Sequence, residues 1–201
     1  MSNMKFEEFN ISEEILKAIK NLEYKKPSDV QAAVIPIALE GRDIIVKSQT
    51  GSGKTAAFAI PLCESANVDE TEPQALVLTP TRELALQVSQ DITNIGRYKK
   101  IRAIAVFGKQ PIEMQKKQLK QRVHVVVGTP GRTLDHIERG SINLSKVKYL
   151  ILDEADEMLS MGFIEQVEAV IKAIPKNRIT MLFSATKIGR AHVWTPVTIR
   201  I

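Results

Sequence analysis

The chain has 201 residues, of which 44% are hydrophobic and 25% charged, and its formal net charge at pH 7 is +5. This length is typical of one domain, and the composition excludes a mostly disordered chain because it supplies enough apolar surface for a core. The apolar runs are too short to span a bilayer, and the single cysteine cannot form a disulfide within the chain. We therefore expect no membrane partner and a reducing, cytoplasmic location.

Two helices are expected near the N-terminus. Ser12 is a candidate N-cap because a helical stripe of apolar residues follows it. That stripe consists of Ile15, Leu16, Ile19 and Leu22. A second helix is predicted within residues 27–39, where Ser28 and Gln31 have the spacing of a capping box.

Short apolar runs occur further along the chain. They lie at residues 43–47, 75–79, 102–107, 123–128, 149–153 and 180–186. The runs do not alternate apolar with polar residues, which is typical of strands that are buried on both faces. Helical patterns separate them, so the sequence predicts an α/β fold with a mostly parallel sheet and helices on both faces. Such sheets bind ligands beyond the carboxyl ends of their strands.

The segment GSGKT at residues 51–55 follows the first of these runs and opens a helical pattern, which is the context of a P-loop. Its glycines allow backbone N–H groups to turn toward phosphate oxygens, and the following helix N-terminus favours the same anion. Lys54 is expected to reach the β and γ phosphates, and the Thr55 hydroxyl to ligate Mg²⁺. The alternative, a glycine turn with an exposed lysine, is disfavoured by the preceding strand.

The run at residues 149–153 ends in two adjacent acids. Asp153 is expected to hold Mg²⁺ at the edge of the sheet, and Glu154 to position or deprotonate an attacking water. With Lys54, these two residues form the candidate catalytic set. The alternative is an acidic turn that is merely solvated.

Five short motifs stand in a fixed order along the chain. They are SQTGSGKT at 48–55, PTRELA at 80–85, TPGR at 129–132, DEAD at 153–156 and SAT at 184–186. Their order and spacing resemble the first RecA-like domain of the DEAD-box RNA helicases, and the resemblance extends from residue 6 to residue 186. It implies a RecA-like P-loop NTPase domain, ATP and Mg²⁺ as cofactors, RNA as a partner, and ATP-dependent RNA helicase activity.

The resemblance implies a nucleotide site built from two segments. In the first, Gln31 reads the adenine edge, Tyr24 stacks on the base and Phe6 supports the segment from outside. The second is the P-loop, with Ser48, Gln49, Thr50, Gly51, Ser52, Gly53, Lys54 and Thr55. Glu23 stands where the family usually has glycine, so a change in the local turn is expected.

The resemblance also implies contacts with the sugars and phosphates of RNA. The residues at matching positions are Thr81, Arg82, Gly108, Thr129 and Arg132. The motifs PTRELA and TPGR each place a hydroxyl and an arginine at a helix N-terminus, and these groups together form an anion site. In TPGR, Arg132 is expected to reach outward from that site. Between these two motifs the family carries two consecutive glycines. In this chain Gly108 is followed by Lys109, so we expect the approach of the RNA backbone to change at this position.

A coupling element is implied between the two sites: the hydroxyls of Ser184 and Thr186 hydrogen-bond Asp156. Beyond it the chain departs from the family. Residues 187–201 have neither a helical stripe nor strand alternation, and we expect them to be foreign to the domain. The expected organisation is therefore N-terminal helices with the adenine-sensing segment at 1–40, a RecA-like domain, incomplete at its C-terminus, at 41–186, and a tail at 187–201.

A narrower resemblance follows from the segments GKQPIEMQ, LDHIERG and ADEMLSMGFIEQVEAVIK, which are similar to bacterial helicases of the DbpA and YxiN type. It implies ribosomal RNA as the partner through a separate C-terminal region, a role in ribosome assembly, and a monomer. The isolated chain is expected to be nearly inactive in unwinding. Two other classes stay open: an RNA clamp that nucleotide locks without unwinding, and a P-loop enzyme acting on a small molecule.

Overall fold

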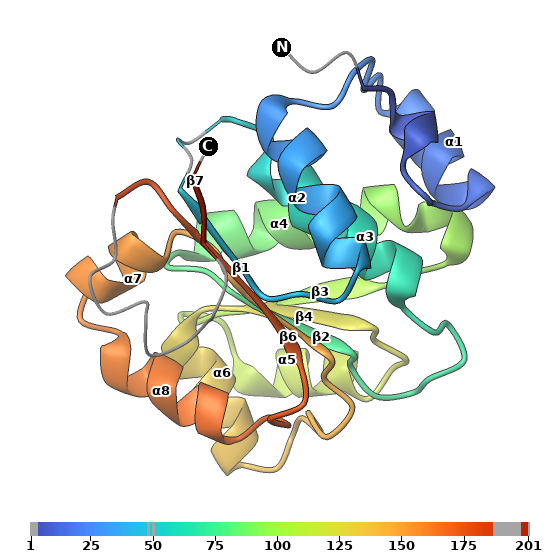
Figure 1. Ribbon diagram of the computed structural model, residues 1–201. Coiled ribbons are helices and arrows are strands. Elements are labelled where there is room, and N and C mark those ends of the chain that lie inside the picture. The colour runs from blue at the N-terminus through green and yellow to red at the C-terminus, as the bar shows by residue number, and fades with distance from the viewer. Residues whose placement is uncertain (1–3, 48, 50, 187–197, 201) are drawn as a thin grey trace.

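A parallel sheet between two layers of helices forms the centre of the computed structural model, which describes residues 4–47, 49, 51–186 and 198–200 (Figure 1). The strands are β1 Ile44–Lys47, β2 Ala75–Leu78, β3 Ala103–Val106, β4 Val125–Gly128, β5 Tyr149–Leu152, β6 Ile179–Ser184 and β7 Thr198–Arg200. Their spatial order is β3-β4-β2-β5-β6-β1-β7, and every neighbouring pair is parallel.

The helices alternate with the strands along the chain. They are η1 Phe6–Glu8, α1 Glu13–Asn21, α2 Asp29–Leu39, α3 Lys54–Ser65, α4 Arg82–Ile95, η2 Arg97–Lys99, α5 Ile112–Leu119, α6 Pro130–Glu138, α7 Ala155–Ser160 and α8 Ile164–Lys172. Within the described ranges, these helices lack the combination of length and apolar character that crossing a bilayer requires.

The predicted α/β fold is confirmed, and strands β1 to β6 agree with the predicted runs to within two residues at each end. Neighbouring residues of each strand point to opposite faces, and both faces are buried. In β2, Ala75 and Val77 join the core beneath α1 to α4, whereas Leu76 and Leu78 join the core beneath α5 to α8 (Figure 1). This double burial explains why the strands lack alternation in the sequence.

The backbone of Thr198–Arg200 forms β7, which pairs in parallel with Ile45–Lys47 of β1. The sequence of residues 187–201 lacks strand alternation and therefore did not indicate this strand, because backbone pairing along an edge strand does not require side-chain alternation. Residues 187–197 and 201 lie outside the described residues, and the foreign origin of the tail stays a prediction.

The start of α1 is held by a distant residue rather than by its own cap. Ser12 is the N-cap by position, but its side chain accepts no capping hydrogen bond. Its Oγ donates to Glu64 Oε2 at 2.7 Å and its backbone N–H to the same oxygen at 2.9 Å. The predicted apolar stripe is confirmed by Ile15 and Ile19, which are buried. Glu64 therefore ties the N-terminal helix to the end of α3.

The turn that ends α1 keeps a left-handed residue although no glycine stands there. Glu23 has φ +59°, and its backbone N–H donates to the carbonyl of Lys20 at 3.0 Å. The substitution of the family's usual glycine therefore leaves the turn in place at a conformational cost, because a side chain is strained in this region.

Replacing Glu23 by glycine should raise the free energy of unfolding by about 0.5–1 kcal/mol. Glycine relieves the backbone strain of the folded state, and this gain exceeds the stability that is lost because the unfolded chain becomes more flexible. Urea denaturation measures this change. Glu23→Ala is the matched control: it removes the same charge but keeps the strained backbone, so no gain is expected. Equal stabilisation by both variants would show that the charge, and not the backbone, is responsible.

Candidate functional site

All the sequence motifs meet at one edge of the sheet, because the carboxyl ends of parallel strands point the same way. Following the strand order, β3, β4 and β2 lead into the segments that contain Gly108, Thr129 and Thr81. The adjoining strands β5, β6 and β1 lead into the DEAD motif, the SAT motif and the P-loop. The edge therefore has two halves, which meet between β2 and β5.

The P-loop enters α3 through glycines with positive φ, at +81° for Gly51 and +88° for Gly53. Gly53 is the N-cap of α3, and a Cβ built on it would lie 2.5 Å from Gln31 Nε2. Glycine is thus required here both for the backbone conformation and for the close approach. Of the other P-loop residues, Gln49 is exposed, whereas Ser48 and Thr50 lie outside the described residues.

The adenine-sensing segment is joined directly to the P-loop. Ser28 Oγ accepts the backbone N–H of Gln31 at 3.4 Å, and Gln31 Oε1 accepts that of Ser28 at 3.0 Å, so the predicted capping box is present. Gln31 Nε2 donates to the carbonyl of Gly53 at 3.1 Å, and Ser28 Oγ to that of Ser52 at 2.8 Å. A side-chain amide has two hydrogens and two lone pairs, so Gln31 keeps a donor and an acceptor for the adenine edge.

Tyr24 and Phe6 stand together beside this segment. The Phe6 ring is buried, Tyr24 is 36% exposed, and the ring centroids are 6.4 Å apart with a 31° tilt. This packing agrees with Phe6 supporting Tyr24 from behind and leaves part of the tyrosine ring open for stacking on a base.

Lys54 and Asp153 bring opposite charges together at the centre of the nucleotide half, where they are 7% and 2% exposed. Burial raises the pKa of Asp153 to about 6, Lys54 lowers it, and Glu154 raises it. Asp153 Oδ1 accepts the backbone N–H of Glu154 at 3.0 Å. Glu154 itself has φ +52°, a strained conformation of the kind that clusters at functional sites.

The residues at this position fit Mg²⁺. Among the described residues, no group of three or more His, Cys, Asp or Glu side chains could hold a metal ion alone. Thr55 and Asp153 offer only oxygen atoms, which Mg²⁺ prefers, and this ion normally takes its remaining ligands from water and substrate phosphates. The raised pKa of Asp153 reflects a buried carboxylate that Lys54 compensates only in part, and a divalent cation would complete that compensation.

The predicted coupling contact differs in its details from the prediction. Thr186 donates to Asp156 Oδ2 from its backbone N–H at 2.9 Å and from Oγ1 at 3.0 Å. Ser184 Oγ instead donates to the carbonyl of Thr186 at 2.8 Å and accepts its N–H at 3.2 Å. Burial raises the pKa of Asp156, but hydrogen bonding from Thr186 and a smaller effect of the Ser184 hydroxyl outweigh it and leave the pKa lowered. Ser184 thus orients Thr186, and Thr186 holds the carboxylate.

In the other half of the edge, Thr81 is the N-cap of α4, and its Oγ1 accepts the N–H of Leu84 at 3.2 Å. Arg82 is exposed, and its guanidinium carbon lies 5.0 Å from the centre of the Phe107 ring. Gly108 is exposed beside it, and Thr129 is the N-cap of α6, with no capping hydrogen bond from its side chain in the described part of the chain. Helix N-termini and an exposed cation give this half the character of an anion site.

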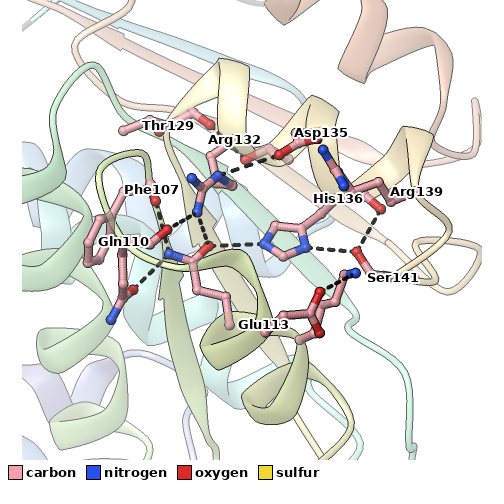
Figure 2. A network of polar contacts seen from close by, with 12 residues as sticks. Phe107, Gln110, Glu113, Thr129, Arg132, Asp135, His136, Arg139 and Ser141 are labelled. Carbon is pink, nitrogen blue, oxygen red and sulfur yellow. Dashed lines mark hydrogen bonds and ion pairs between the residues drawn. The ribbon is translucent and has the colours of Figure 1, made fainter.

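The prediction that Arg132 reaches outward was wrong. Its Nη1 donates to the carbonyl of Gln110 at 2.9 Å and to Gln115 Oε1 at 3.1 Å, and its Nε lies 3.7 Å from the Asp135 carboxylate (Figure 2). The side chain is only 15% exposed. Arg132 turns inward because α5 and the loop before it offer acceptors that satisfy the buried guanidinium.

Gln115 and His136, both fully buried, were missed by the sequence reasoning. The available signal was a glutamine at the spacing of the apolar face formed with Ile112 and Leu119. A polar side chain on such a face must find partners in the interior.

A glycine loop at a helix N-terminus, facing a buried carboxylate at the end of a parallel strand, defines a P-loop nucleotide-binding domain of the RecA-like class. Residues 28–192 match the family model described as DEAD/DEAH box helicase. The chain therefore belongs to the DEAD/DEAH box helicase family.

Two curated relatives and one solved structure agree with this family assignment. The chain is 60% identical over 202 residues to an ATP-dependent RNA helicase DbpA of Bacillus subtilis, covering 98% of this chain and 42% of that protein. It is 50% identical to a DEAD-box ATP-dependent RNA helicase CshA of Geobacillus kaustophilus, covering 90% of this chain and 39% of the relative. The crystal structure of a DEAD box protein from Methanococcus jannaschii matches all of this chain and 56% of its own, with 45% identity and a TM-score of 0.93. The chain thus spans about two fifths of the length of these curated relatives.

Without nucleotide or metal, Asp153→Asn should stabilise the chain at neutral pH by on the order of 2–3 kcal/mol. The folded pKa of about 6 lies above the ordinary 3.8, so ionisation of Asp153 opposes folding above pH 6. This penalty fades as the pH falls through 6 and is absent below 3.8, so the benefit of the substitution should disappear there.

Urea denaturation of both forms at neutral and at acid pH measures this difference. Asp156→Asn is a control of opposite sign, because the pKa of Asp156 is lowered and the ionised carboxylate supports the fold. A stability gain from Asp153→Asn that does not change with pH would contradict the assignment.

Proposed function

We propose that the chain is the ATP-binding domain of an ATP-dependent RNA helicase, an enzyme that uses ATP binding and hydrolysis to open short RNA duplexes. One observation carries the proposal: a single sheet edge places the P-loop, Lys54 and Asp153 next to the N-termini of α4 and α6, and Thr186 hydrogen-bonds Asp156 on the P-loop side. A P-loop enzyme acting on a small molecule has no use for these two further N-termini. The printed names of the relatives support the same activity.

On the nucleotide side, Gln31 would select adenine, and Lys54 with the α3 N-terminus would bind the phosphates. Thr55 and Asp153 would hold Mg²⁺, which when bound neutralises charge that develops on the phosphates. Glu154, fixed next to Asp153 in its left-handed conformation, would orient the attacking water and accept its proton.

On the RNA side, Thr81, Arg82, Gly108 and Thr129 would contact sugars and phosphates. Such contacts grip the backbone and carry little base information, so the domain would bind RNA largely independently of sequence. Asp156 would transmit the state of the nucleotide site through Thr186, because any shift of α7 alters a hydrogen bond at the end of β6.

We further propose ribosomal RNA as the substrate and ribosome assembly as the process. The support is the segment GKQPIEMQ, which runs from the preceding loop into α5, and the segment LDHIERG, which covers the end of α6. A cytoplasmic, monomeric protein agrees with the lone cysteine, Cys63, which is buried and whose pKa burial raises to about 12. An RNA clamp without unwinding differs from this proposal in one measurable respect, since only the helicase opens a duplex as it turns ATP over.

Lys54→Ala should weaken binding of Mg²⁺–ADP at least about tenfold, because it removes the charged donor to the phosphates. Titration with a fluorescent ADP analogue measures the affinity. Lys146→Ala is the control, because that side chain is 55% exposed and pairs with Glu70 at 4.0 Å. Unchanged nucleotide affinity in Lys54→Ala would refute the proposed nucleotide site.

Arg82→Ala should weaken binding of a short single-stranded RNA and reduce its salt dependence by about one phosphate contact. Fluorescence anisotropy at several salt concentrations measures both quantities. Arg42→Ala is the matched control: its exposed guanidinium lies just before β1, away from the carboxyl edge, and pairs with Glu40 at 3.0 Å. An equal effect of the two variants would indicate general electrostatic attraction rather than a site.

A further inference from the structure

The loop that joins β3 to α5, residues 107–111, is anchored by one buried side-chain amide, that of Gln115. Gln115 is fully buried, and its Nε2 donates to the carbonyl of Phe107 at 2.9 Å and to Gln110 Oε1 at 2.7 Å. Its Oε1 accepts Arg132 Nη1 at 3.1 Å and lies 3.0 Å from His136 Nε2. Both donors and both acceptor positions of the amide are therefore used.

These contacts fix the tautomer of His136. Gln115 Oε1 can only accept, so His136 Nε2 carries the proton. In the neutral ring Nδ1 then accepts from Ser141 Oγ at 2.8 Å, which is closer than the other acceptor of that hydroxyl, the His136 carbonyl at 3.1 Å. A flipped amide would direct its NH₂ group at Arg132, which can only donate. The hydrogen bonds consequently run in one direction, from Ser141 through His136 to Gln115.

The surroundings keep His136 neutral. Burial lowers its pKa to about 4, Arg132 acts in the same direction, and Asp135 raises it. Lys116 on α5 and Arg139, which directly follows α6, lower it further. The direction of the network is therefore stable at neutral pH.

The anchored loop carries the features of the RNA half of the edge. Between the two anchored residues, Phe107 and Gln110, lies Lys109 with a strained φ of +61°. The Phe107 ring lies beneath the exposed guanidinium of Arg82, and Gly108 is exposed next to it. Movement of the loop would therefore displace both Arg82 and the backbone that RNA has to approach.

We infer that Gln115, held by Arg132 and His136, is a positioning residue for RNA binding: its amide fixes the loop at 107–110 and, through the Phe107 ring, the guanidinium of Arg82. The inference rests on the proposed RNA-binding function. It also gives Arg132 a role in place of a direct phosphate contact, namely that of holding the loop from the side of α6.

The test compares Gln115→Leu with Gln74→Leu in the 201-residue chain. Gln74 is also buried, and its amide likewise ties down a loop by bonding the N–H and carbonyl of Asn67 at 2.8 and 2.7 Å, but it precedes β2 at the opposite edge. Both variants should lose stability. Only Gln115→Leu should weaken binding of a fluorescent oligouridylate, by about tenfold for one lost charge-assisted contact. Affinity for the ADP analogue should be the same in both.

Gln115→Glu serves if the leucine variant does not fold. The carboxylate still accepts from Arg132 and His136 but cannot donate to the loop, so RNA affinity should fall while the fold is retained. A lower ¹⁵N order parameter at the Lys109 amide, which reports greater motion of the loop, should accompany both Gln115 variants and be absent in Gln74→Leu. In the unsubstituted chain, ¹⁵N NMR should show His136 Nδ1 without a proton.

Wild-type RNA affinity in a folded Gln115 variant, or an equal loss of affinity in Gln74→Leu, would overturn the inference. If the unsubstituted chain binds nucleotide but no RNA, the proposed function fails. The order parameter at Lys109 then still decides the positioning role, which an unchanged value would disprove.

Discussion

The parallel alignment of the strands is the constraint on which the rest of this structure depends. It brings every strand–helix junction to one edge, and the register keeps neighbouring strand ends level, with Leu78 opposite both Gly128 and Leu152. Along the chain, the segment after β1 has a proposed nucleotide role, those after β2, β3 and β4 proposed RNA roles, and those after β5 and β6 return to the nucleotide site. The strand order sorts them: β1, β6 and β5 group the nucleotide residues, and β2, β4 and β3 group the others. The two sites that the proposed function has to connect therefore meet at adjacent strands, β2 and β5.

Buried charges and a strained backbone in the nucleotide half cost free energy, and packing of the core offsets this cost. Lys54 and Asp153 are buried although each would be better solvated in water, and Glu154 holds a strained backbone conformation. Beneath them, α3 is apolar along most of its length, and its Phe58 ring packs 5.3 Å from that of Phe183 in β6. This packing fixes the first turn of α3 and therefore the position of Lys54. A site that is charged and dehydrated before the ligand arrives is prepared for an anion with a divalent cation.

The sequence was sufficient for those features that depend on local pattern. Short apolar runs without alternation predicted strands that are buried on both faces, and a glycine-rich segment between a strand and a helix predicted the P-loop. It was insufficient where the outcome depends on a partner distant in the chain. Ser12 has the identity of a cap, yet it bonds Glu64, 52 residues away. Arg132 follows a helix start in the usual way, but Gln115, 17 residues earlier, turns it inward. Local periodicity says which side of an element is buried, but it does not say which polar groups meet there. For the same reason the pattern missed β7, which is defined by backbone pairing alone.

The two halves of the edge solve the same conformational problem by different means. Each needs a loop that turns through positive φ and exposes its backbone to a phosphate. The P-loop uses glycine at 51 and 53, where a Cβ on Gly53 would also collide with Gln31. The loop after β3 has Lys109 in the left-handed region instead, at a cost on the order of 1 kcal/mol. A backbone that is strained in this way persists only when its surroundings determine it fully. The fully satisfied amide of Gln115 does this from within the core, so the departure from the family's paired glycine and the buried network are best understood as one feature.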